Sequence, residues 1–185
     1  IAPAGVQRTH HQFKPVAAEV GEPDHVFDLA RRAVGGRPAS RCNAKFGKRL
    51  LRCVEIARAY AAERHGFGIR LADRESIQLM LGDLAMRIEI GRLLVMKAAW
   101  ALDQGSFARK EVSMAKVHVA NLLHAAADTA IQINGARGYS KDTVLEWIYR
   151  YARCARLVDG ASEVHKMVLA RAYGAEGNDF WTWES

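Results

Sequence analysis

The sequence has 185 residues, of which half are apolar and a quarter charged, so it is long enough for one domain with a sizeable core and too apolar for a disordered chain. Lysine and arginine (27) exceed aspartate and glutamate (20), and the net charge of +7 suits an anionic partner such as a phosphate-bearing ligand, a nucleic acid or a membrane surface, without choosing among them. The three cysteines, Cys42, Cys53 and Cys154, form no CxxC pair, which argues against a disulfide framework or a zinc site and favours a reducing compartment.

All four prolines fall near the start of the chain, at Pro3, Pro15, Pro23 and Pro38. Residues 1–36 show no sustained periodicity apart from "VFDLARRAV", so we expect an irregular lead-in there. After "GGRP" the apolar pattern turns helical and stays so, without a proline to break it.

The first long helix is predicted over residues 39–65, where apolar residues recur at steps of three and four, and it should end at Gly66 or Gly68. We expect Asp73 to cap a second helix, which then runs to Gly105. A third helix follows Ser106 and stops at "NGARGYS".

Ser140 is expected to cap a fourth helix that runs to about Arg156, and a short fifth helix follows the break at Asp159 and Gly160. No segment alternates at period two for long enough to predict a strand. Short connections between such long helices force neighbours to run antiparallel. The sequence therefore predicts an all-α fold, an antiparallel bundle of long helices with four main helices and a short fifth, over residues 37–175, followed by a tail at 176–185.

No stretch approaches the roughly 18 apolar residues of a membrane span, and residues 1–14 lack the architecture of a signal peptide. We therefore expect a cytoplasmic protein that does not insert into a membrane, or a mitochondrial matrix protein if the source is a eukaryote. His118, His124 and His165 lack the spacing of metal ligands, and we expect no metal site.

Two breaks in the helical pattern are candidates for a functional site: "QINGARGY" (132–139) and the Asp159–Gly160 pair. The first is also explained by a glycine at the end of a helix followed by a tight turn, and the second by a carboxylate at a helix end. No strand precedes the glycines of the first break, which excludes the dinucleotide fingerprint of a doubly wound sheet.

Four stretches in series resemble the C-terminal helical domain of the acyl-CoA dehydrogenase family, over about residues 37–173. They are "AERHGFGIRL" (62–71), "LMLGDLAMRIEIGRLLVMKAAWALDQG" (79–105), "KEVSMAKVHVANLLHAAADTAIQINGARGY" (110–139) and "YRYARCARLVDGASEVHKMVLAR" (149–171). Within the family, "DGASEVH" is most similar to the branch that includes family members ten and eleven.

The resemblance implies α,β-dehydrogenation of an acyl-CoA thioester with FAD as the hydride acceptor. Asp159 stands where the family has its catalytic glutamate, although it is one methylene shorter. A base of this kind must lie in an apolar slot, where its affinity for a proton rises. The other position that some members use, near the start of the first long helix, has no carboxylate in "GGRPASRCNAKFG".

The resemblance also implies FAD contacts in three groups. Arg64 and Phe67 match residues that reach the FAD of a neighbouring subunit, although they also fit a surface arginine and a core phenylalanine. The second group is the loop along the adenosine half of FAD, with Gln132, Ile133, Gly135 and Ala136. The third group is the segment that lines FAD beside the base, with Gly160, Ala161, Ser162 and Glu163. Arg109 is a candidate for a CoA phosphate, with a solvated basic face as the alternative.

The implied partners are an acyl-CoA substrate, further copies of the chain in a dimer or tetramer that shares FAD across subunits, and an electron-transfer flavoprotein as the acceptor. Family members also have an N-terminal helical domain and a middle β domain, so we expect a fragment or a subunit, with residues 1–36 as a possible remnant of the middle domain. The alternative is an inactive helical scaffold or oligomerisation subunit. Nucleic-acid binding is not expected, because the basic residues are scattered over all helices.

Overall fold

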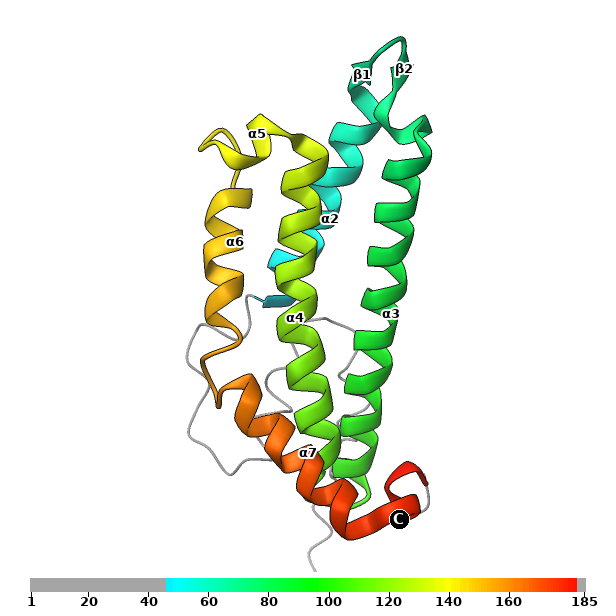
Figure 1. The fold of residues 1–185 in the computed structure, drawn as a ribbon, viewed down its shortest axis with the longest axis vertical. Helices are drawn as coiled ribbons and strands as arrows, with labels where there is room; N and C mark the ends of the chain where they lie inside the picture. Colours follow the sequence, from blue (N-terminus) through cyan, green and yellow to red (C-terminus); the bar gives the residue numbers. More distant parts are fainter. Residues whose placement is uncertain (1–45, 183–185) are drawn as a thin grey trace, which may run out of the picture.

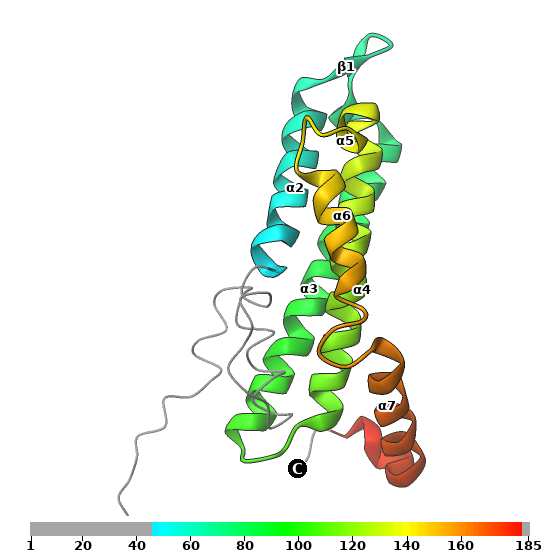
Figure 2. The same ribbon diagram turned by 90° about the vertical axis from the view of Figure 1, so that its left-hand side faces the viewer.

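The computed structural model describes residues 46–182, which form a bundle of antiparallel helices. Helix α2 (Phe46–Glu63), α3 (Glu75–Asp103), α4 (Arg109–Asn134) and α6 (Leu145–Cys154) run alternately up and down (Figure 1). Helix α7 (Ser162–Glu176) continues from α6 at an angle to the bundle (Figure 2). The prediction of an all-α bundle is confirmed, but the fifth helix, with 15 residues, is longer than the fourth, with 10.

Helix α4 lies at the centre and packs against α2, α3, α6 and α7 (Figure 1). Small side chains make this possible, because alanine lets the axes of neighbouring helices approach closely. The buried alanines of α4 are Ala115, Ala120, Ala126, Ala127 and Ala130. Leu123 of α4 and Leu145 and Ile148 of α6 are among the largest fully buried side chains of the same core.

A hairpin that the sequence did not predict joins α2 to α3. Strands β1 (His65–Gly66) and β2 (Ile69–Arg70) pair antiparallel, and the tip residues Phe67 and Gly68 have φ angles of 53° and 84°. Positive φ at both tip residues is typical of a type I′ turn, which matches the twist of a two-residue hairpin. Strands of two residues are too short to leave an alternating pattern in the sequence.

Two predicted helix caps are wrong because the side chains find closer partners. Asp73, in the 3₁₀ turn η3 (Leu71–Asp73), accepts hydrogen bonds from Arg70 at 2.9 and 3.1 Å, and α3 begins after Arg74 without a side-chain cap. The Ser140 hydroxyl follows the single turn α5 (Ala136–Tyr139) and bonds to Asp142 instead of capping α6. The hydroxyl that meets the start of α6 is that of Thr143, which accepts from the backbone N–H of Leu145 at 3.3 Å.

The chain beyond α7 folds back as a 3₁₀ helix, η4 (Gly177–Trp181), whose Phe180 is buried. Lys110 of α4 holds it by donating hydrogen bonds to the Glu176 carboxylate at 2.6 Å and to the Phe180 carbonyl at 3.2 Å. None of the helices within residues 46–182 is long and apolar enough to cross a bilayer.

Helix α3 is apolar on two sides, and only one of them is covered. Leu84, Val95, Ala98 and Ala99 face the bundle, whereas a second row is exposed to solvent. We call this row the α3 stripe; it consists of Leu79, Met86, Ile90, Leu93, Met96 and Trp100, each at least 40 % exposed. A row of exposed apolar side chains of this kind is typical of surfaces that contact another molecule.

Cys53 gives the bundle a measurable dependence on pH. Burial raises the pKa of its thiol from 9.0 to about 12, so the unfolded chain ionises first as the pH rises. Stability contributed by the neutral thiol is present below pH 9 and is lost between pH 9 and about 12, at about 1.4 kcal/mol per pH unit. Cys53→Ala should remove this slope while any packing cost stays constant. Urea unfolding of both proteins from pH 8 to 11 measures the difference, and a constant difference would contradict the burial of the thiol.

Candidate functional site

The corner between α6 and α7, residues 157–161, has an unusual backbone. Asp159 and Gly160 both adopt left-handed conformations, with φ angles of 55° and 86°. Aspartate is one of the few residues with a side chain that enter this region readily, and glycine enters it without strain. The Asp159 side chain is exposed, while the backbone of the corner is closed by a bond from the Ser162 N–H to the Arg156 carbonyl at 3.0 Å.

Buried polar side chains hold the corner from the α4 side. Lys116 is only 3 % exposed, and its ammonium donates a hydrogen bond to the Gly160 carbonyl at 2.5 Å. His165, in the first turn of α7, is 9 % exposed, and its Nε2 lies 3.2 Å from the Asp159 carbonyl. Its Nδ1 lies 3.1 Å from the hydroxyl of the buried Ser113 on α4. Two successive carbonyl groups of the corner therefore each have a buried partner.

The charge of Lys116 is unusual for a side chain so well buried. Burial lowers the pKa of its ammonium below the ordinary 10.5, and the carboxylates of Asp159 and Glu163 act in the opposite direction and raise it. These two carboxylates lie close enough to the ammonium to offset part of the cost of burying it. Lys116 thus links α4 electrostatically to both acids of the corner.

Ser162 is the first residue of α7, and its hydroxyl has no partner in the folded chain. The side chain is 1 % exposed, and its Oγ is one of two buried side-chain atoms without a hydrogen bond among the described residues. A buried hydroxyl without a partner costs free energy. At the same point the start of α7 carries the positive end of a helix dipole, and Ala161 offers no side-chain cap. The start of α7 therefore suits a polar or anionic group, while the Ser162 hydroxyl itself is enclosed by the chain.

The residues assigned to a neighbouring subunit's FAD lie at the far end of the bundle from the corner (Figure 1). Phe67, at the hairpin tip, is fully exposed, and Arg64 is exposed beside the hairpin. Gln132, Gly135 and Ala136 are exposed at the end of α4, and Gly135 has a φ of 60°. Ile133 differs, because its side chain is in the core and leaves only its backbone for a ligand.

One chain does not bring these two groups together. Lys116 marks the level of the corner on α4 and Gln132 marks its far end, so about 16 residues and roughly 24 Å of helix separate them at about 1.5 Å per residue. A single ligand site that uses both groups from one chain is therefore not present in the described residues. The geometry allows both groups to serve ligands only if each meets a different molecule or a different subunit.

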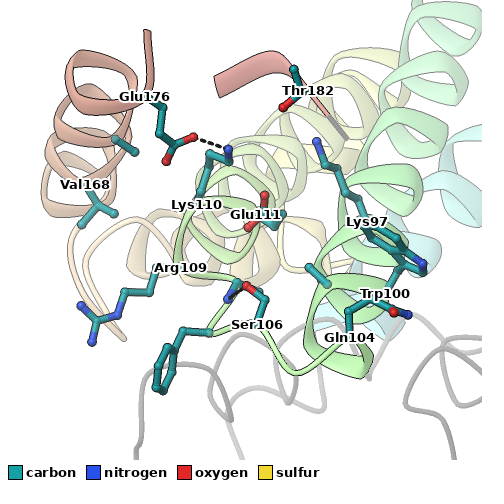
Figure 3. A pocket seen from close by; sticks show the side chains of 14 residues that line it. Lys97, Trp100, Gln104, Ser106, Arg109, Lys110, Glu111, Val168, Glu176 and Thr182 are labelled. Atoms are coloured by element: carbon teal, nitrogen blue, oxygen red, sulfur yellow. Dashed lines mark hydrogen bonds and ion pairs between the residues drawn. The ribbon is translucent and has the colours of Figure 1, made fainter. Parts of the chain in front are cut away.

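Arg109 lies apart from both the corner and the hairpin end, at the start of α4 and opposite to Gln132. It lines a cavity of about 670 Å³ between the α3–α4 turn, the start of α4 and the last turns of α7 (Figure 3). Trp100, Lys97 and Lys110 also line it, and the Arg109 guanidinium lies 5.9 Å from the ring of the exposed Phe107. Asp159 is not among the lining residues. No group of three His, Cys, Asp or Glu side chains suited to a metal occurs within residues 46–182.

Lys116, Ser113 and His165 are the site residues that sequence reasoning missed. One signal was present, since Lys116 falls on the apolar side of its helix, directly after Ala115 and three residues before Val119. A lysine in an apolar row needs a buried partner, but the pattern cannot say that the partner is a carbonyl 44 residues away. His165 had no metal-ligand spacing and was given no role.

Comparison with known proteins gives a consistent result. Residues 29–174 match the family described as "Acyl-CoA dehydrogenase, C-terminal domain". The caffeyl-CoA reductase–Etf complex subunit CarC of Acetobacterium woodii is 39 % identical over 117 residues, which cover 63 % of this chain and 31 % of that protein. The chain spans about a third of the length of the curated relatives it matches.

Two solved structures have the same arrangement of helices. One is a glutaryl-coenzyme A dehydrogenase in complex with glutaryl-CoA, with a TM-score of 0.68 and 28 % identity over 81 % of this chain and 37 % of that chain. The other is an FAD complex of PigA, with a TM-score of 0.67 and 26 % identity over 74 % of this chain and 35 % of that chain. Both similarities extend over most of the described bundle.

Proposed function

Because the chain belongs to the acyl-CoA dehydrogenase family, as a C-terminal domain, we propose that it is the helical part of an FAD-dependent enzyme that introduces an α,β double bond into an acyl-CoA thioester. The observation that carries the proposal is the Asp159–Gly160 corner. There a carboxylate sits on left-handed backbone, held from behind by buried groups and followed by a buried hydroxyl without a partner. A plain helix end needs none of these features.

Asp159 acts in this proposal as the base that removes a proton from the carbon next to the thioester carbonyl. FAD, when bound, supplies the acceptor for the hydride that leaves the β carbon. In the chain alone the Asp159 side chain is exposed, so the apolar cover that raises its proton affinity has to come from the remainder of the enzyme. Relatives about twice as long as this chain have room for such a remainder.

The residues of the corner fit the FAD that the family binds. The start of α7 offers backbone N–H groups to polar atoms of the cofactor, with the enclosed Ser162 side chain behind it, and Gly160 and Ala161 allow close approach. Glu163 follows in the first turn of α7. These residues are proposed to line FAD beside the base.

The far end of the bundle is proposed to hold the FAD of a second subunit. Phe67 is fully exposed on left-handed backbone, with the Arg74 guanidinium 5.5 Å from its ring centroid, and a cofactor ring would cover it. Arg64 beside it suits a pyrophosphate, and Gln132, the Ile133 backbone, Gly135 and Ala136 suit the adenosine half. The separation between this end and the corner supports a dimer or tetramer that shares FAD, and the exposed α3 stripe supplies apolar surface for its assembly.

Further partners follow from the relatives. Glutaryl-CoA bound to one structural relative supports an acyl-CoA substrate, for which Arg109 is the candidate phosphate ligand, and the Etf complex of CarC supports an electron-transfer flavoprotein as the acceptor. Membership of the branch of family members ten and eleven rests on "DGASEVH" alone. A cytoplasmic or, in a eukaryote, a mitochondrial matrix location fits this chemistry.

An inactive oligomerisation or scaffold subunit is the second candidate function. The α3 stripe and the exposed position of Asp159 favour it, because a scaffold needs the stripe and has no use for a covered carboxylate. A scaffold equally has no use for Phe67 at the hairpin tip. The α3 stripe suits both candidates, so the hairpin tip is the feature that a test can use to distinguish them.

The test is FAD retention by the complete enzyme that carries this chain. We expect a yellow protein with about one FAD per chain, absorbing near about 450 nm, and the mass of a dimer or tetramer in sedimentation. Phe67→Ala should lower FAD affinity by about 10-fold, because the ring loses its cover on the cofactor. Phe107→Ala, which removes a 78 % exposed phenylalanine from the other end of α4, is the matched control. A colourless oligomer, or equal FAD loss in both variants, would favour the scaffold.

A further inference from the structure

Within residues 46–182 the Asp159 side chain makes no hydrogen bond that would fix the direction of the corner, although its carboxylate attracts the Lys116 ammonium. Asp159 is exposed and Gly160 has no side chain. A short connection with two left-handed residues is held in place only if other groups determine its conformation, since such conformations are sparsely populated by themselves. The groups that do so lie on α4 and on the first turn of α7.

The hydrogen-bond chemistry of these groups is determined by their partners. The Asp159 carbonyl can only accept, so Nε2 of His165 carries the proton and donates to it at 3.2 Å. In the neutral ring Nδ1 then accepts from the Ser113 hydroxyl at 3.1 Å. The result is a directed chain from Ser113 on α4, through His165, to the peptide carbonyl of Asp159.

Lys116 holds the next carbonyl of the same segment. Its ammonium donates to the Gly160 oxygen, and a charged donor makes a hydrogen bond stronger than a neutral one. Gly160 also packs directly on the histidine, because a Cβ at this position would lie 2.9 Å from Nε2 of His165. The carbonyls of Asp159 and Gly160 are therefore both fixed from the buried side, while the Asp159 side chain is exposed and its carboxylate is attracted by the Lys116 ammonium.

We propose that Lys116 and His165, with Ser113 behind His165, are positioning residues that fix the two carbonyls of the corner and thereby direct the Asp159 carboxylate toward the substrate. The proposal rests on the assignment of Asp159 as the base. It predicts that Lys116 affects the rate of flavin reduction only through the position of Asp159. It also predicts that Lys116 fixes the corner whether or not the corner performs chemistry.

The experiment uses Lys116→Met in the complete enzyme. Methionine fills the same buried space without the donor, and removal of a poorly solvated charge should leave the fold intact. Reduction of bound flavin by acyl-CoA should slow by about 10- to 100-fold, while the dissociation constant of acyl-CoA changes by less than about threefold. Lys166→Met, which removes an exposed lysine of α7, is the matched control and should reduce flavin at the wild-type rate.

A double-mutant cycle separates positioning from a general structural role. In the Asp159→Asn background, Lys116→Met should slow the residual reaction no further, because the group it positions is already absent. An equal slowing in both backgrounds would overturn the proposal. Ser113→Ala is the milder second variant, expected to slow the reaction by about 3- to 10-fold with the same loss of effect in the Asp159→Asn background.

Hydrogen–deuterium exchange of the complete enzyme gives a readout that does not depend on activity. Lys116→Met should speed exchange in the peptide that covers residues 157–165 by about 10-fold and leave the peptides of α3 unchanged. Unchanged exchange at the corner would overturn the proposal even if activity fell. If Asp159→Asn alone reduced flavin at the wild-type rate, the base assignment would fail, and the exchange result would still decide whether Lys116 fixes the corner.

Discussion

Asp159→Asn is expected to slow reduction of bound flavin by acyl-CoA at least about 100-fold in the complete enzyme, because an amide cannot accept the proton that the reaction releases. Asparagine has nearly the same size and also enters the left-handed region, so the corner should keep its shape. Binding of acyl-CoA should therefore change by less than about threefold. Stopped-flow measurement of flavin bleaching and titration with acyl-CoA give the two quantities.

Two further variants make this result specific. Asp179→Asn in η4 makes the same chemical change at an exposed position outside the corner and should leave the rate unchanged. Asp159→Glu restores a carboxylate with one more methylene, as the family has, and should recover part of the rate lost in the asparagine variant. A wild-type rate in Asp159→Asn would remove Asp159 as the base.

Gly160→Ala is expected to lower the free energy of unfolding by about 2–4 kcal/mol, the largest effect that we expect from adding one methyl group to the corner. The residue has a φ of +86°, which costs an alanine about 1–2 kcal/mol. The new Cβ would also lie 2.9 Å from Nε2 of His165, so the ring has to move away from the Asp159 carbonyl and the Ser113 hydroxyl. Urea unfolding of the 185-residue chain measures the loss.

Gly174→Ala, within α7, is the matched control. A Cβ there meets no atom within 4 Å, and the residue is helical, so alanine should stabilise the chain by about 0.5 kcal/mol through its helix propensity. The two substitutions are thus expected to have opposite signs. A destabilisation of equal size at both positions would mean that the corner imposes no special constraint on Gly160.

The fold was predictable because its main determinants are local and periodic. The second helix was expected to end at Gly105, and α3 ends at Asp103; the third was expected after Ser106, and α4 begins at Arg109. The predicted caps failed where a polar side chain could choose between partners. Asp73 bonds to Arg70, three residues away, and no periodicity records that choice.

The candidate site was predictable only in part, for a related reason. The break at Asp159 is visible in the sequence because a glycine interrupts two helical patterns. What holds the break in place is not visible, since Lys116 contacts it across 44 residues of chain and Ser113 acts through His165, 52 residues away. The roles of Asp159 and of the FAD contacts remain predictions from the resemblance.

The alanine-lined helix α4 sets the distance between the two candidate sites of the molecule. It carries the anchors of the corner near one end and the Gln132 loop at the other, and it is surrounded by four helices along its length. Inserting one residue between Lys116 and Gln132 would lengthen the helix by about 1.5 Å and also rotate one end relative to the other by about 100°. The distance between the two sites therefore cannot change without a change in their relative orientation. We therefore expect an insertion or deletion to preserve both ends of the helix only where it falls in the connections outside this segment.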